Sequence, residues 1–221
     1  MDIEKLPDQI VDSIVNNNLS ASAIDLSEIG IDKLLDETFL SDFPIPIFNT
    51  VIKSIRVVMH IRDKIFLAKV VKFFLCLDSI SIEDKKAFKR KMEEDSKFKK
   101  KVGETLLLIL ERLDDLAKPE IIAKVFKAFL SGKITFSDFQ RVALAVDIAY
   151  IDDLRMLIGQ PVDRPTFDWD YMENLLRTGL VKIGNVETPM FPGRSAGEIS
   201  YELSPMGYLF EMIMRDRWPL S

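Results

Sequence analysis

Apolar and polar residues alternate at helical spacing along most of the chain, which predicts a mainly α-helical fold. The densest apolar stretch runs from Pro44 to Leu77, and a positive charge interrupts it every few residues. From Ile47 onward, apolar residues recur on one helical face and basic residues on the opposite face. The stretch therefore predicts an amphipathic helical hairpin with a bend near Arg62-Asp63.

Capping residues and helix breakers divide the rest of the chain into further helices. Ser81, with Asp84 three residues later, predicts one helix N-terminus, and Asp95-Ser96 predicts the next. Lys118-Pro119 predicts the start of a helix over 121–130, because proline is favoured in a first helical turn. The other expected segments are a helix over 7–16, a helix or irregular segment over 22–39, an extended linker over 41–46, and a long helix from Thr135 or Ser137 to about Ile158.

The pattern changes beyond residue 160, where turn residues become frequent. The expected elements are a helix over 168–178 closed by Gly179, strands over 180–183 and 200–203, and a last helix from Ser204-Pro205 to about Arg217. Helix, strand, loop, strand, helix is the order of a winged helix.

The predicted fold is mainly α, with a multi-helix bundle followed by a small winged-helix-like α+β unit at the C-terminus. The predicted division is N-terminal helices and linker over 1–43, a helical bundle over 44–160, and the winged-helix-like unit over 161–221.

The charges are distributed unevenly. The chain has 30 Lys/Arg and 35 Asp/Glu, a net charge of −5. Residues 53–101 hold 15 basic and 7 acidic residues, a local charge of +8, so the remaining 15 basic and 28 acidic residues give −13. Such asymmetry indicates either that the basic region pairs with the chain's own acids or that it binds an acidic partner.

Part of this basic region is a candidate surface for a partner or a lipid, made of Lys53, Arg56, Arg62, Lys64, Lys89 and Arg90. Basic amphipathic helices bind anionic membrane surfaces, but the same apolar face could equally be buried in a helical bundle. The recurring charges exclude a membrane span in the 44–77 stretch. The 85–101 region could be an anion-binding patch or a solvated helix pair, because acids interleave with its lysines.

The residues that could support catalysis are few. His60 is the only histidine, which excludes a metal site built on histidines, and Cys76 is the only cysteine, which excludes an intrachain disulfide. Gly132 lies in a stretch that mimics half of a calcium loop, but Lys127 and Phe129 would occupy ligand positions there. Phosphate-binding and dinucleotide-binding glycine motifs are absent from the sequence. We expect no catalytic, cofactor-binding or metal-binding residues, and no enzymatic activity.

Two segments, 175–181 and 201–210, resemble the wing and final helix of many bacterial winged-helix proteins. With the P-x-P-x-F sequence at Pro44 and the Ile61–Phe66 segment, the chain is similar to the bacterial abortive-infection alpha family and related proteins. The resemblance implies a bacterial protein of the cytoplasm with a link to phage defence, and it supplies no catalytic residues.

We therefore expect a non-enzymatic interaction or regulatory protein, with a protein partner or a second copy of itself. The alternatives are a membrane-acting effector that uses the basic 44–77 segment and a DNA-binding regulator. The acidic helix before the wing and the pI near 5.1 disfavour nucleic acid. The start of the sequence has no signal-like apolar run, so we expect a cytoplasmic location, with peripheral association with the inner membrane if the basic segment binds lipid.

Overall fold

The computed structural model describes residues 5–16, 61–77, 80–159, 170–184 and 200–216. Within them the protein is mainly helical, with a small two-stranded antiparallel sheet near the C-terminus, as the sequence predicts. The 22–39 segment, the 41–46 linker, and the candidate residues Lys53, Arg56 and His60 lie outside the described residues.

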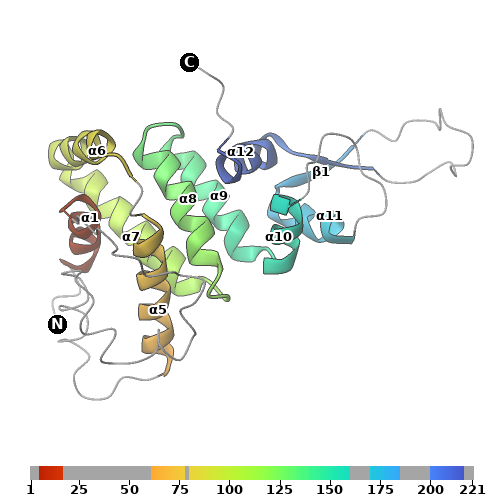
Figure 1. Cartoon of the computed structure of the whole chain (residues 1–221), viewed down its shortest axis with the longest axis horizontal. Helices are drawn as coiled ribbons and strands as arrows, with labels where there is room; N and C mark the ends of the chain where they lie inside the picture. Colours follow the sequence, from red (N-terminus) through yellow and green to blue (C-terminus); the bar gives the residue numbers. More distant parts are fainter. Residues whose placement is uncertain (1–4, 17–60, 78–79, 160–169, 185–199, 217–221) are drawn as a thin grey trace, which may run out of the picture. The chain divides into compact units, whose positions relative to one another are not determined.

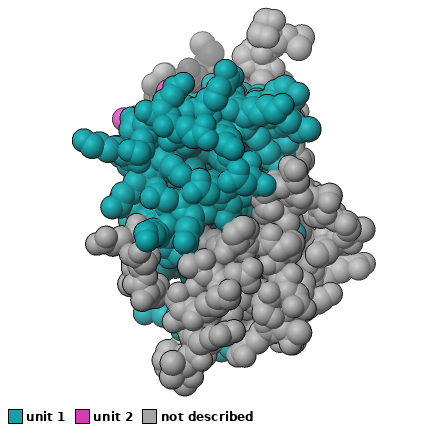
Figure 2. Space-filling model, turned by 90° about the vertical axis from the view of Figure 1, so that its left-hand side faces the viewer, with its two compact units in different colours: residues 1–134 teal, residues 135–221 magenta. Residues whose placement is uncertain are grey.

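The chain divides into two compact units, Met1–Ile134 and Thr135–Ser221, and Figure 2 shows the first of them in teal. This division falls earlier than the predicted boundary near 160, because the helices over 136–148 and 151–159 pack with the elements that follow them. We refer to these bodies as unit 1 and unit 2.

In the described residues of unit 1 the regular elements are all helices. Helix α7 lies against α1, α5 and α6, and α8 lies against α5 and α6 (Figure 1). The bounds are α1 Leu6–Asn16, α5 Ile61–Cys76, α6 Ile82–Glu94, α7 Ser96–Arg112 and α8 Lys118–Leu130.

Aromatic rings fasten the core of unit 1. The ring of Phe73 on α5 lies edge-on to Phe126 on α8, with a centroid distance of 5.7 Å. Phe88 on α6 makes the same kind of contact with Phe126 at 5.9 Å and with Phe129 at 5.7 Å. Edge-to-face pairs are favourable beyond their burial, so this cluster fixes three helices to one another.

Helix α5 is the described half of the apolar 44–77 stretch, and it belongs to the core of unit 1. Its side chains from Leu67 to Leu75 are buried, with the exception of Lys72. Arg62 and Asp63, where the sequence predicts a bend, lie in its first turn. Within the described ranges of the chain, no helix combines the length and apolar character that crossing a membrane requires.

The predicted caps of α6 and α7 are confirmed. The Ser81 hydroxyl accepts a hydrogen bond from the Asp84 amide at 3.0 Å, and the Asp95 carboxylate accepts one from the Phe98 amide at 2.9 Å. Asp95 is both the C-cap of α6 and the N-cap of α7, so a single residue joins the two helices. The hairpin corner is therefore short and defined by its own hydrogen bonds.

Helix α1 approaches α7 at backbone distance. A Cβ atom on Gly103 would overlap the Pro7 carbonyl group, so only glycine fits at this crossing. Ile10 and Val11 of α1 are fully buried. The glycine therefore lets a short helix, which would be marginal alone, reach the core.

Unit 2 consists of α9 Phe136–Ile148, α10 Ile151–Gly159, α11 Asp170–Leu175, the 3₁₀ turn η2 Leu176–Thr178, β1 Val181–Ile183, β2 Tyr201–Leu203 and α12 Pro205–Met214. The strands pair antiparallel, with Val181 opposite Leu203 and Ile183 opposite Tyr201. The predicted strands are therefore confirmed to within a residue.

One expectation in unit 2 is wrong. The chain does not form one helix from Thr135 to Ile158, because α9 ends at Ile148 and Ala149 adopts an extended conformation with ψ of 147°. Asp152 and Asp153 then occupy the first turn of α10, where the positive end of the helix dipole favours acids. Thr135, one of the two predicted caps, forms a reciprocal capping box with Asp138.

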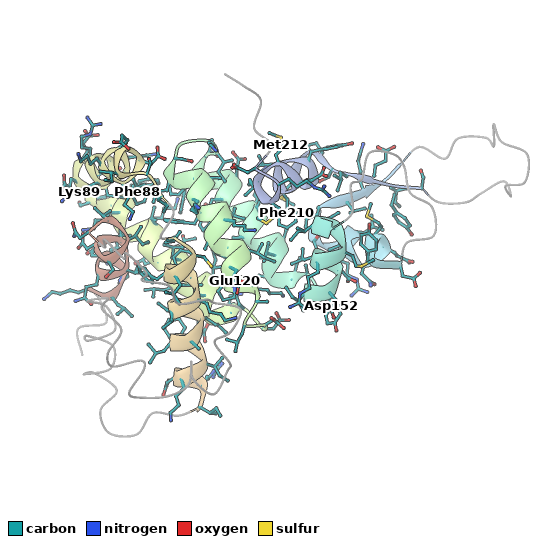
Figure 3. All side chains as sticks on the ribbon, viewed as in Figure 1. Phe88, Lys89, Glu120, Asp152, Phe210 and Met212 are labelled. Carbon is teal, nitrogen blue, oxygen red and sulfur yellow. The ribbon has the colours of Figure 1, made fainter. Side chains whose placement is uncertain are left out.

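The last helix is shorter than predicted. Helix α12 ends at Met214 rather than near Arg217, since Arg215 is its C-cap and Asp216 has a positive φ of 50°. Its start is as expected, because the Ser204 hydroxyl accepts a hydrogen bond from the Gly207 amide at 3.0 Å. The side chain of Phe210 is fully buried within the fold (Figure 3).

Candidate functional site

The cations of α5 are directed at acids and carbonyls of unit 1 itself. The Lys72 ammonium lies 3.5 Å from a Glu120 carboxylate oxygen of α8, and Lys72 is only 14% exposed. The buried Lys69 donates a hydrogen bond to the backbone carbonyl of Glu111 at 3.0 Å. That carbonyl is in the last turn of α7, where a cation complements the helix dipole. These lysines are structural.

The two predicted site residues on α5 differ in how exposed their side chains are. Arg62 is 89% exposed and lies 3.9 Å from the Glu111 carboxylate, while Lys64 is half-buried. An exposed pair at this distance contributes little to stability. The Glu111 carboxylate of the same chain nevertheless lies near Arg62, so α5 is a weak candidate for a basic surface that binds an acidic partner.

The hairpin of α6 and α7 differs from α5. Phe88 and Met92 are the buried residues of α6, and their spacing turns Lys86 and Arg90 to the outer face. Figure 3 labels Phe88 and Lys89 on this helix. The exposed cations of the hairpin that we treat as one surface, the basic corner, are Lys86, Lys89, Arg90, Lys97 and Lys100.

Members of the basic corner have weak partners or none. Lys89 lies 3.9 Å from Glu93 and 3.4 Å from the Asn16 side-chain oxygen, and Lys100 lies 4.0 Å from Glu104. Around Lys86, Arg90 and Lys97, no carboxylate of the described residues lies within 4.0 Å. Three cations of this surface are therefore not neutralised by the described part of their own chain.

The first turn of α7 carries lysines where a helix dipole favours acids. It contains Lys97 and Lys99 and no acidic residue. The Asp95 carboxylate, at the N-cap of α7, partly offsets the positive charge of these lysines. The Lys99 ammonium also pairs with the Asp12 carboxylate of α1 at 2.6 Å. Positive charge at a helix N-terminus is unfavourable, so Lys97 lowers the stability of α7.

A lysine and two aromatic rings fix the base of the corner. The Lys91 ammonium lies 5.3 Å from the Phe98 ring centre and 5.5 Å from that of Phe129. These cation–π contacts connect α6, α7 and α8, so the corner is built on a well-anchored hairpin.

The thiol of Cys76 lies in an environment that disfavours its ionised form. Burial is the main cause that raises the pKa of the Cys76 thiol to about 11, which keeps it protonated at neutral pH. The Cys76 side chain is half-buried. Among the residues that the structure places, no three His, Cys, Asp or Glu side chains converge as metal ligands.

Two of the six predicted site residues, Lys89 and Arg90, belong to the basic corner, and Arg62 and Lys64 lie on α5. The prediction did not select Lys86, Lys97 or Lys100 individually. The sequence does carry a signal for Lys86, because this residue precedes Arg90 by one helical turn and lies opposite Phe88 and Met92.

Searches with the chain find no matching protein-family model, no matching curated protein and no matching solved structure. The resemblance to the abortive-infection alpha family therefore stays a prediction.

Proposed function

We propose that this chain is a non-enzymatic interaction protein that binds its partner through the basic corner. The observation that carries the proposal is the set of exposed cations, Lys86, Arg90 and Lys97, that have no carboxylate within ion-pair distance among the described residues. We assign Cys76 no catalytic role, because burial raises its pKa and a protonated thiol is a poor nucleophile.

For unit 2 we propose a winged-helix-like arrangement that packs or binds protein rather than DNA. The order α11, β1, β2, α12 supports it. Helix α11 carries Asp170 and Glu173 and no basic residue, and these acids would repel phosphates. The DNA-binding alternative is therefore disfavoured.

The membrane-acting alternative receives no support from α5. A segment that inserts into a bilayer would have to withdraw its apolar side chains from the core, where Phe73 and Phe126 are in ring contact. We propose a cytoplasmic protein, and a role in bacterial phage defence rests on the sequence resemblance alone.

Site-specific photocrosslinking in cells tests the proposed function. A photoreactive amino acid replaces Arg90 in the basic corner or, as a control in unit 2, the exposed Arg155, which pairs with Asp152 at 2.8 Å. We expect a crosslinked product of defined mass from position 90 and none from position 155. Equal products from both positions, or none from position 90, would contradict the proposal.

Gel filtration with light scattering of the same samples distinguishes a second copy of this chain from a different protein. Phage challenge of cells that carry the wild-type chain or the Arg90→Glu variant tests the defence role separately.

A further inference from the structure

We propose that the basic corner recognises an acidic α-helix of a protein partner, and not a nucleic acid or a membrane surface. This inference rests on the proposed function and specifies the chemistry of the partner. Its basis is the spacing of the cations, the acids that flank them, and a contact of the same type that already exists within the chain.

The cations of the corner recur once per helical turn. Lys86 and Arg90 are four residues apart on α6, and Lys97 and Lys100 are three residues apart on α7. Side chains at these intervals lie about 5–6 Å apart on a helix surface. Carboxylates at the same intervals on a second helix repeat at the same distance, so the two ladders of charge can match in register.

Exposed acids flank the cations on the same helix. Glu83, Glu93 and Glu94 of α6 are all exposed. Duplex DNA carries a charge about every 1.7 Å along its axis when both strands are counted, so phosphates would approach these acids as well as the cations. An anionic membrane presents its charges over a continuous surface and would likewise face both. A helix with one carboxylate per turn can meet the cations and leave the acids in water.

The chain already holds one acidic helix on this hairpin. Helix α1 contains Asp8 and Asp12 and no basic residue. Its Asp12 carboxylate lies 2.6 Å from the Lys99 ammonium, and its Asn16 side chain lies 3.4 Å from Lys89. Beside its apolar packing on α7, α1 thus makes one contact of the type that we assign to the partner, at Lys99, two residues after Lys97.

The test measures binding of the full chain to three probes at low and at high salt. The first is a labelled synthetic helix of about 18 residues, five turns long, with one glutamate per turn along one face. Its counterpart with glutamine in place of glutamate is the peptide control. The other two probes are a short DNA duplex and phosphatidylglycerol vesicles.

The variant Lys86→Gln/Arg90→Gln/Lys97→Gln removes the three cations that have no carboxylate of the described residues within 4.0 Å. A matched control, Arg141→Gln/Arg155→Gln/Arg177→Gln, removes three exposed cations of unit 2. Circular dichroism and thermal unfolding of both variants verify that they fold.

We expect the glutamate helix to bind the wild type and the control variant, and to bind the corner variant about tenfold more weakly. High salt and the glutamine peptide should both abolish binding. If the wild type does not bind the glutamate helix, or binds the duplex or the vesicles more tightly, the inference is wrong.

The two proposals fail in different ways. If the duplex or vesicles bind the wild type and lose affinity for the corner variant, the corner is still an interaction surface and only the partner class is wrong. If the corner and control variants bind every probe equally, the corner does not bind and the proposed function fails with it.

Discussion

Helix α5 and the α6–α7 hairpin belong to the same basic stretch of sequence, yet they differ in the cations that they expose. On α5, Lys69 is buried against the end of α7 and Lys72 faces Glu120. On the hairpin, Lys86 and Lys97 face water without a carboxylate of the described residues nearby. The comparison shows that one basic stretch can contain both cations that stabilise the fold and cations with no nearby carboxylate among the described residues. The two kinds differ in burial.

The largest effect should come from the structural side of this comparison. Replacing Lys69 by alanine removes a buried side chain and leaves the Glu111 carbonyl without its donor. We expect a loss of about 3 kcal/mol in the free energy of unfolding, measured by urea denaturation. Lys86→Ala is the matched control, and its loss should stay below about 0.5 kcal/mol. Equal losses would remove the distinction between the two regions.

The second prediction concerns the helix that already occupies one side of α7. Gly103→Ala places a methyl group on the Pro7 carbonyl and must displace α1. We expect a loss of about 2 kcal/mol in unfolding free energy, because the obstructing atoms are backbone and cannot rotate away. Gly159→Ala, where a Cβ atom would meet nothing within 4 Å, serves as the control. A neutral Gly103→Ala variant would show that α1 does not pack closely on α7.

The third prediction is a gain in stability rather than a loss. Lys97→Glu replaces a cation in the first turn of α7, which has no ion pair with the described residues, by an acid, which the helix dipole favours. We expect a gain of about 0.5 kcal/mol in unfolding free energy at low salt, together with weaker binding of an acidic helix. Thermal unfolding at two salt concentrations measures the gain, which should shrink at high salt. A loss of stability at low salt would show that Lys97 has a structural role after all.

The smallest effect is a pH dependence in unit 2, where an anion rather than a cation is buried. Burial is the main cause that raises the pKa of Asp153 above its usual 3.8, and the nearby Asp152 adds to it, while a hydrogen bond from Asn174 opposes it. The folded protein therefore keeps this proton to higher pH than the unfolded chain. The resulting stabilisation is full below 3.8 and is lost as the pH rises through the raised value.

Asp153→Asn removes that titration. Chemical denaturation at several acidic pH values should show a flatter pH dependence for the variant than for the wild type. Asp152→Asn, which changes an exposed neighbour, is the comparison variant. Identical pH profiles for wild type and Asp153→Asn would contradict the assignment.

The fold was predictable where a cap or a glycine fixes the backbone. Ser81, Asp95 and Gly179 mark their helix ends by local hydrogen bonds or a left-handed conformation, and local sequence suffices to find these. The break at Ala149 was not predicted, because neither glycine nor proline marks it. Only the paired acids at 152 and 153 indicate a new helix start there.

The motif behind the family resemblance has a structural explanation. Ser204 caps α12 and donates a hydrogen bond to the Gly179 carbonyl at 2.6 Å. A Cβ atom on Gly207 would overlap the Leu180 carbonyl. These residues hold α12 against the start of β1, so their pattern predicts local architecture and carries little information about function.

The candidate site was predictable only in part, because exposure and pairing depend on tertiary contacts. Arg62 and Arg90 look alike in the sequence, and only the fold brings Glu111 of α7 close to Arg62. Lys86 belongs to the site because Phe88 and Met92 form the buried side of α6, which leaves Lys86 on the exposed side.

The single-residue joint at Asp95 has a consequence for the order of folding. The contacts between α6 and α7 are local in sequence, so the hairpin can form early and quickly. The Lys99–Asp12 contact spans 87 residues, and its loop closure must come later. We therefore expect α1 to dock last, onto a hairpin that is already formed, and hydrogen exchange should find α1 protected after α6 and α7.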